Sequence, residues 1–114
     1  MKINISTLIY PTEDADKVKK AVEDIFPNVK FKITKSKMSG QALDVESLSK
    51  IKDIVEKKRI RATIRYLLLE HGNLMLNKQT AVIGKINFVE EEHTLGNINV
   101  NIDDIDRALE YLTK

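Results

Sequence analysis

The chain has 114 residues, of which 42% are hydrophobic and 32% are charged, and its formal net charge is +2. This length and composition are typical of one folded domain, residues 1–114, and they exclude an intrinsically disordered chain. The absence of cysteine excludes disulfides and thiolate metal sites, and the unbroken apolar runs, such as 67–69, are too short to cross a membrane.

The first part of the chain predicts one strand before an amphipathic helix and two strands after it. Apolar residues at every second position predict a strand that Pro11 ends. Thr12 is the expected N-cap of the helix that follows, since acidic residues fill the next turn. The predicted elements are strands over 3–10, 29–34 and 38–43, with the helix between the first two.

The middle of the chain predicts two helical runs, with Asp44 or Ser47 as the cap of the first. Three consecutive basic residues, 57–59, interrupt the apolar stripe, so we expect a bend or break there. Gly72 is the expected residue after the second run, because glycine readily adopts the left-handed conformation that ends helices.

The last part of the chain predicts strands over 74–77, 81–89 and 98–102, and a final helix capped by Asp103. Residues 77–80 are expected to form a polar break and residues 90–97 a loop. The resulting order, β-α-β-β-α-α-β-β-β-α, predicts an α+β fold in which helices pack on one face of a mainly antiparallel sheet.

Charge is distributed unevenly along the chain. Residues 30–65 hold eleven basic and four acidic residues, a net charge of +7, whereas residues 86–114 hold seven acidic and two basic residues, a net charge of −5. Such asymmetry is typical of a nucleic-acid face or of an interface between copies. The favoured interpretation is simpler, namely that the two segments lie side by side and neutralise each other.

No catalytic motif is present, so we expect no enzyme, no cofactor and no metal. The four glycines are isolated and form no phosphate-binding loop. His71 is expected at a helix end, where a partly charged imidazole suits the helix dipole. His93 follows three glutamates, and solvated loop acids explain this run better than a metal site.

Two stretches are candidates for nucleic-acid binding. The first is a basic stripe that would track a phosphate backbone if the helix continued through residues 57–59. The second is a short polar run whose amides and ammonium would contact bases or an anion, although a simple turn is the favoured interpretation. The candidate residues are Lys57, Lys58, Arg59, Arg61 and Arg65 in the stripe, and Asn77, Lys78 and Gln79 in the polar run.

Three stretches in this order resemble the archaeal uncharacterised protein family 0201, whose members are sometimes labelled RNA-binding or exosome-subunit-like. They are the run Tyr-Pro-Thr-Glu-Asp at 10–14 with its following helix, the run 48–69, and Leu-Asn-Lys-Gln-Thr-Ala at 76–81 followed by Gly-Lys-Ile at 84–86. The resemblance implies a homodimer whose fold is similar to that of the large-subunit ribosomal protein that contacts the small ribosomal RNA. It implies no established activity.

Two hypotheses follow from these observations. The first is a cytoplasmic, non-enzymatic protein that associates with RNA through the basic stripe. The alternative is a homodimeric protein-interaction module with no nucleic-acid role. Neither a membrane nor DNA is an expected partner. The N-terminal residues lack the apolar core of a secretory signal, so we expect no signal peptide.

Overall fold

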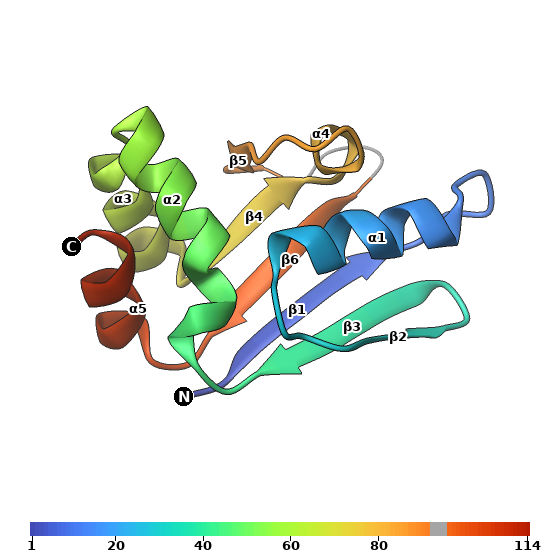
Figure 1. Ribbon diagram of the computed structural model, residues 1–114, viewed down its shortest axis with the longest axis horizontal. Helices are drawn as coiled ribbons and strands as arrows, with labels where there is room; N and C mark the ends of the chain where they lie inside the picture. Colours follow the sequence, from blue (N-terminus) through green and yellow to red (C-terminus); the bar gives the residue numbers. More distant parts are fainter. Residues whose placement is uncertain (92–95) are drawn as a thin grey trace.

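A six-stranded antiparallel sheet with strand order β2-β3-β1-β6-β4-β5 organises the computed structural model, which describes residues 1–91 and 96–114 (Figure 1). The N-terminal strand β1 therefore lies in the middle of the sheet, between β3 and β6. The elements are β1 Ile3–Leu8, α1 Ala15–Ile25, β2 Phe31–Thr34, β3 Lys37–Ala42, the 3-10 helix η1 Val45–Leu48, α2 Ser49–Lys58, α3 Arg61–His71, β4 Asn73–Asn77, α4 Lys78–Val82, β5 Phe88–Val89, β6 Asn97–Ile102 and α5 Ile105–Leu112.

The sheet has one buried face, as its alternating sequence predicts. In β1, Ile3 and Ile5 are buried while Asn4, between them, is exposed. The buried residues of the strands and of α1, α2, α3 and α5 form one apolar core. In Figure 1, α1 crosses in front of the sheet, and α2, α3 and α5 gather at one end. The opposite face, which carries Asn4, is left polar and open.

Several predicted boundaries are confirmed. The expected break between the two central helices occurs at Arg59, a left-handed residue with φ of 56°, whose N–H bonds back to the last turn of α2. Gly72 follows α3 with φ of 71°. The strands expected near 38–43 and 98–102 correspond to β3 and β6.

Two predicted helix caps are wrong by one or two residues. Asp14, not Thr12, caps α1, and its carboxylate accepts from the backbone N–H groups of Asp16 and Lys17. Asp104, not Asp103, caps α5, and its carboxylate accepts from the Arg107 N–H. The Asp103 carboxylate instead accepts from the Lys2 N–H.

The predicted strand over 81–89 is also wrong. Its first residues belong to α4, and the chain forms only the two-residue strand β5 near the end of the run. The helix starts because the Asn77 side chain accepts a hydrogen bond from the Thr80 N–H and so acts as its N-cap. The surrounding polar residues are equally typical of a loop, so the sequence does not indicate this cap. No helix among the described residues has the length and apolarity that a membrane span requires.

Candidate nucleic-acid interface

The open face of the sheet carries a row of four amide side chains on four neighbouring strands. The register places Gln41 of β3 opposite Asn4 of β1, Asn4 opposite Asn101 of β6, and Asn101 opposite Asn73 of β4. Residues directly opposite each other in a sheet have Cβ atoms about 5 Å apart, so this amide row spans roughly 14 Å. The Gln41 Nε2 donates to the Asn4 Oδ1 at 3.0 Å, which confirms that the side chains meet.

A row of lysines borders these amides at the β2–β3 edge. Lys32 lies opposite Ser39, which in turn lies opposite Ser6 of β1. A cavity of about 570 Å³ occupies this part of the open face, and we call it the sheet hollow. Its lining consists of Asn4, Ile5, Ser6, Lys30, Lys32, Lys37, Ser39, Gly40, Gln41 and Asn101.

The sheet hollow is cationic and free of carboxylates. None of the six described strands contains an Asp or a Glu. The hollow is lined by three lysines and no acid, and none of these lysines takes part in an ion pair between described residues. Its polar groups are therefore suited to a ligand with negative charge and with hydrogen-bonding edges.

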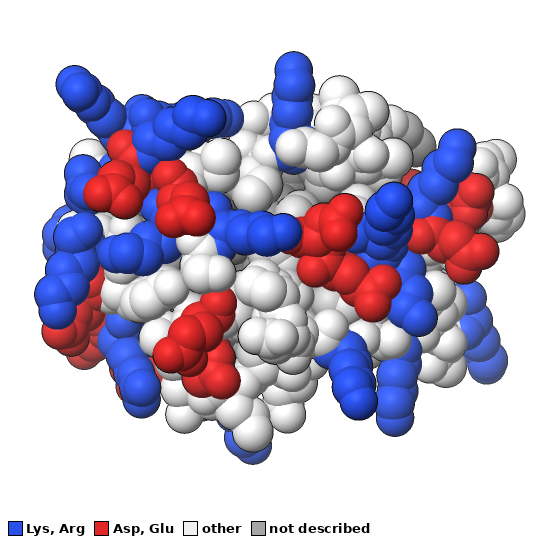
Figure 2. Space-filling view, in the orientation of Figure 1, with Lys and Arg blue, Asp and Glu red and all other residues white. Residues whose placement is uncertain are grey.

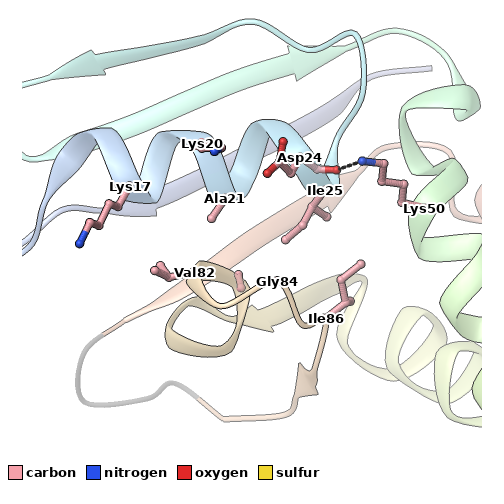
Figure 3. A pocket seen from close by; sticks show the side chains of 10 residues that line it. Lys17, Lys20, Ala21, Asp24, Ile25, Lys50, Val82, Gly84 and Ile86 are labelled. Atoms are coloured by element: carbon pink, nitrogen blue, oxygen red, sulfur yellow. Dashed lines mark hydrogen bonds between the residues drawn. The ribbon is translucent and has the colours of Figure 1, made fainter.

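A second, larger depression lies on the other side of the sheet, between α1 and α4. This groove has a volume of about 690 Å³ and a mainly apolar lining, with Lys17 at one end and Lys50 at the other (Figure 3). Asp24 also lines it, and the Lys50 ammonium is already bound to the Asp24 carbonyl oxygen. Its cations are thus partly compensated by protein groups, in contrast to those of the sheet hollow.

Comparison with known proteins places this chain in a family. A family model described as RNA binding matches residues 2–103. A UPF0201 protein of Methanothermobacter thermautotrophicus is 33% identical over 119 residues, which cover 97% of this chain and 89% of the relative. The chain belongs to the UPF0201 family.

Other relatives and solved structures extend this result. A UPF0200/UPF0201 protein of Archaeoglobus fulgidus is 36% identical over 98% of this UPF0201 chain, which spans only 37% of that longer relative. A crystal structure of an uncharacterized UPF0201 protein has a TM-score of 0.80 and 32% identity, covering 100% of this chain and 94% of the other. A UPF0201 structure from Methanococcus jannaschii has a TM-score of 0.79 and 27% identity, with the same coverage. The resemblance to a ribosomal protein stays a prediction.

The basic stripe predicted from the sequence is divided by the break between α2 and α3, so its members do not share one helix face. Lys57 and Lys58 end α2, where cations suit the helix dipole, whereas Arg61 begins α3. Arg61 lies 3.8 Å from Glu56, and Lys58 approaches the Ile86 carbonyl at 3.4 Å. The remaining cations of the stripe, Lys57, Arg59 and Arg65, are exposed.

The last helix of this UPF0201 chain, α5, packs beside that helical part of the basic segment. Helix α5 contacts both α2 and α3, and the Lys52 ammonium donates to the Tyr111 carbonyl at 2.8 Å while lying 5.1 Å from the Tyr111 ring centre. Acidic and basic side chains alternate over the face shown in Figure 2. In contrast, the lysines of β2 and β3 lie at the far edge of the sheet from α5 (Figure 1).

The polar run at 77–79 has a mainly structural role in this protein. Asn77 caps α4, and Lys78 is 1% exposed. The Lys78 ammonium donates to Glu13 Oε1 and to the Leu8 carbonyl, both at 2.8 Å, so it is not free to contact an RNA phosphate. Gln79 is exposed on α4, on the helical side of the sheet.

These contacts bring together two of the sequence runs on which the family resemblance rests. The first motif, 10–14, supplies Glu13 and the Tyr10 ring, whose centre lies 4.7 Å from the Lys78 ammonium. The second motif, 76–81, supplies Lys78. The two motifs therefore meet in space and join the end of β1 to the start of α4.

The amide row is the feature that sequence reasoning missed. The alternating asparagines of β6 indicated a polar face, but only the strand order aligns one of them, Asn101, with Asn4, Gln41 and Asn73. Within the described residues, no group of three His, Asp or Glu side chains could hold a metal. Glu92 and His93 lie outside the described residues, while His71 ends α3 with its ring 5.8 Å from that of Tyr66.

Proposed function

We propose that this UPF0201 protein is a cytoplasmic, non-enzymatic RNA-binding protein that holds RNA at the sheet hollow. The observation that carries the proposal is a lysine-bordered polar face on strands that contain no carboxylate. The family model described as RNA binding supports the same class of ligand.

The chemistry of the hollow suits a polyanion. Lysine ammonium groups act as mobile point charges for phosphates, and each phosphate contact releases counterions from the nucleic acid. The short side chains beside the lysines, such as Ser6 and Ser39, offer hydrogen bonds without blocking the approach of a strand. Lys30, Lys32 and Lys37 are therefore the proposed phosphate contacts.

The cations near the α2–α3 junction form a competing site for the same ligand. Lys57, Arg59 and Arg65 are exposed and stay candidate phosphate contacts. Their surroundings favour them less, because the Glu56 carboxylate pairs with Arg61 beside them, whereas no carboxylate lines the sheet hollow.

Paired variants of equal charge distinguish the two sites. We expect Lys32→Ala/Lys37→Ala to weaken binding to a mixed-sequence RNA and to lower the slope of log affinity against log salt by about 1 to 2, since two phosphate contacts are lost. Arg59→Ala/Arg65→Ala removes the same formal charge from the competing site and is the matched comparison. Filter binding over a salt series, with circular dichroism to confirm folding, measures both effects.

The proposal is wrong for the hollow if the lysine variant keeps the wild-type slope and the arginine variant loses it. It is wrong altogether if the wild-type protein shows no salt-dependent RNA binding near physiological ionic strength.

A homodimeric interaction module is the second candidate function. The observation in its favour is on α3, where Tyr66 and Leu69 are 47% and 58% exposed and lie one turn apart. Exposed apolar residues that adjoin each other are typical of protein contact surfaces. Sedimentation equilibrium of the wild-type protein and of Leu69→Lys tests whether this face joins two copies.

A further inference from the structure

We propose that the amide row binds the base edges of single-stranded RNA while the neighbouring lysines hold its phosphates. This inference rests on the proposed function and adds to it a ligand class, unpaired RNA, and a second set of contacts. The residues of the amide row are Gln41, Asn4, Asn101 and Asn73.

The amide side chains of the row are accessible to a ligand. Gln41, Asn4 and Asn101 are exposed, and Asn73 is half-buried. Each amide offers both a donor and an acceptor, which is the pairing that base edges require. Among the hydrogen bonds between described residues, the bond from Gln41 to Asn4 is the one that uses a side-chain amide of the row, so most of its capacity is left for a ligand.

The open sheet face favours unpaired bases over a duplex. Three of the amides, Asn4, Gln41 and Asn101, line the hollow, and none can enter the deep, narrow major groove of an A-form helix. Unpaired bases can be splayed out and laid against such a surface. A duplex would offer the amides only the 2′-hydroxyls and degenerate base edges of its shallow minor groove, whereas an unpaired base offers its whole hydrogen-bonding edge.

Hydrogen bonding, rather than stacking, must then distinguish the bases. The aromatic residues of the described strands are Phe31 and Phe88, and the register places both on the core face, opposite Gly40 and Leu76 respectively. Stacking platforms tolerate any base because every base has a π-face, whereas amide contacts depend on the donor and acceptor pattern of each base. We therefore expect discrimination among bases.

A second copy of this chain is a poorer occupant of the same face. Protein interfaces are built around apolar and aromatic side chains, and the centre of the open face is formed by amides and hydroxyls. Pairing two such faces would also bring together lysines with no carboxylate on either strand set to neutralise them.

Fluorescence anisotropy with labelled oligonucleotides tests the inference. The probes are short single-stranded RNAs, each of one base type, and a hairpin duplex of equal length. We expect the wild-type protein to bind at least one single-stranded RNA about tenfold more tightly than the hairpin, and to differ among the bases by a similar factor.

Two sets of variants separate the contacts. Asn4→Ala/Asn101→Ala is expected to abolish most of the discrimination while leaving the salt slope unchanged, because no charge is removed. Gln41→Ala is a milder variant of the same row, and Gln79→Ala is its matched control, since it removes an exposed amide from the helical side of the sheet. Lys32→Ala/Lys37→Ala is expected to weaken all RNAs by about the same factor and to reduce the slope.

Three results overturn the inference. Equal binding of hairpin and single strands would exclude selection of unpaired RNA. Unchanged base discrimination in the folded amide variants would exclude the amide row. A sedimentation shift to dimer that disappears in the amide variants would assign the face to a second copy. In the first two cases the lysine variant still decides the proposed function by itself.

Discussion

At the residue scale, Lys78 is a buried charge whose ammonium is fully provided with partners. Its ammonium has a carboxylate oxygen and a carbonyl oxygen at 2.8 Å and an aromatic ring beneath it. Glu13 also accepts from the Tyr10 N–H at 2.9 Å, so a single carboxylate holds both its own loop and the lysine. The sequence motifs indicated these residues but not their contact, because 65 positions separate Glu13 from Lys78.

Replacing this lysine is expected to be costly. Lys78→Met should lower the free energy of unfolding by about 3 kcal/mol, because it leaves Glu13 and the Leu8 carbonyl without their partner in a largely buried site. Urea denaturation measures the change. The double variant Glu13→Gln/Lys78→Met should lose less than the sum of the two single variants, and strict additivity would show that the pair is not coupled.

At the scale of secondary-structure elements, alternation predicted strands reliably and failed where a helix was short. Strands β1, β3 and β6 have apolar residues at every second position facing the core. Helix α4 has five residues, too few for a helical period to appear. The apolar run that begins within it therefore has the pattern of a strand over 81–89. The caps of α1 and α5 were misplaced because adjacent polar residues can each serve, and the path of the preceding loop selects one of them.

The break between α2 and α3 carries a prediction of its own. Arg59 has φ of 56° and ψ of 48°, a left-handed conformation that costs residues with a Cβ atom more than glycine. Arg59→Gly should therefore raise the free energy of unfolding by about 1 kcal/mol, as measured by urea denaturation. Arg59→Ala is the control, since it removes the same charge but keeps the Cβ atom, and equal stabilisation by both would indicate a charge effect.

At the scale of the whole molecule, the start of the chain is bound to the residue that follows β6. The Asp103 carboxylate accepts from the Lys2 N–H at 2.7 Å, and the Asp103 N–H donates to the Lys2 carbonyl at 3.1 Å. The first of these bonds lowers the pKa of Asp103 below its ordinary value of 3.8. Asp103 thus fastens the first strand to the last instead of capping α5.

This contact has a defined pH dependence. Because the folded-state pKa is lowered, the ionised carboxylate stabilises the fold above the unfolded-state pKa, and this contribution is lost as the pH falls through the folded-state value. Asp103→Asn should therefore flatten part of the decline in unfolding free energy between about pH 5 and about pH 2. Denaturation at several pH values measures it, and parallel curves for variant and wild type would contradict this assignment.

The sequence by itself determined the class of the fold, the buried face of the sheet and the break between α2 and α3, because each depends on the order of neighbouring residues. The tertiary structure alone decided where charge lies. It divided the basic segment, packing α2 and α3 against α5 while leaving the β2 and β3 lysines at one edge of the sheet. It also aligned Gln41, Asn4, Asn101 and Asn73 into one row. Strand pairing joins residues that are distant along the chain, and no local pattern specifies which strands become neighbours.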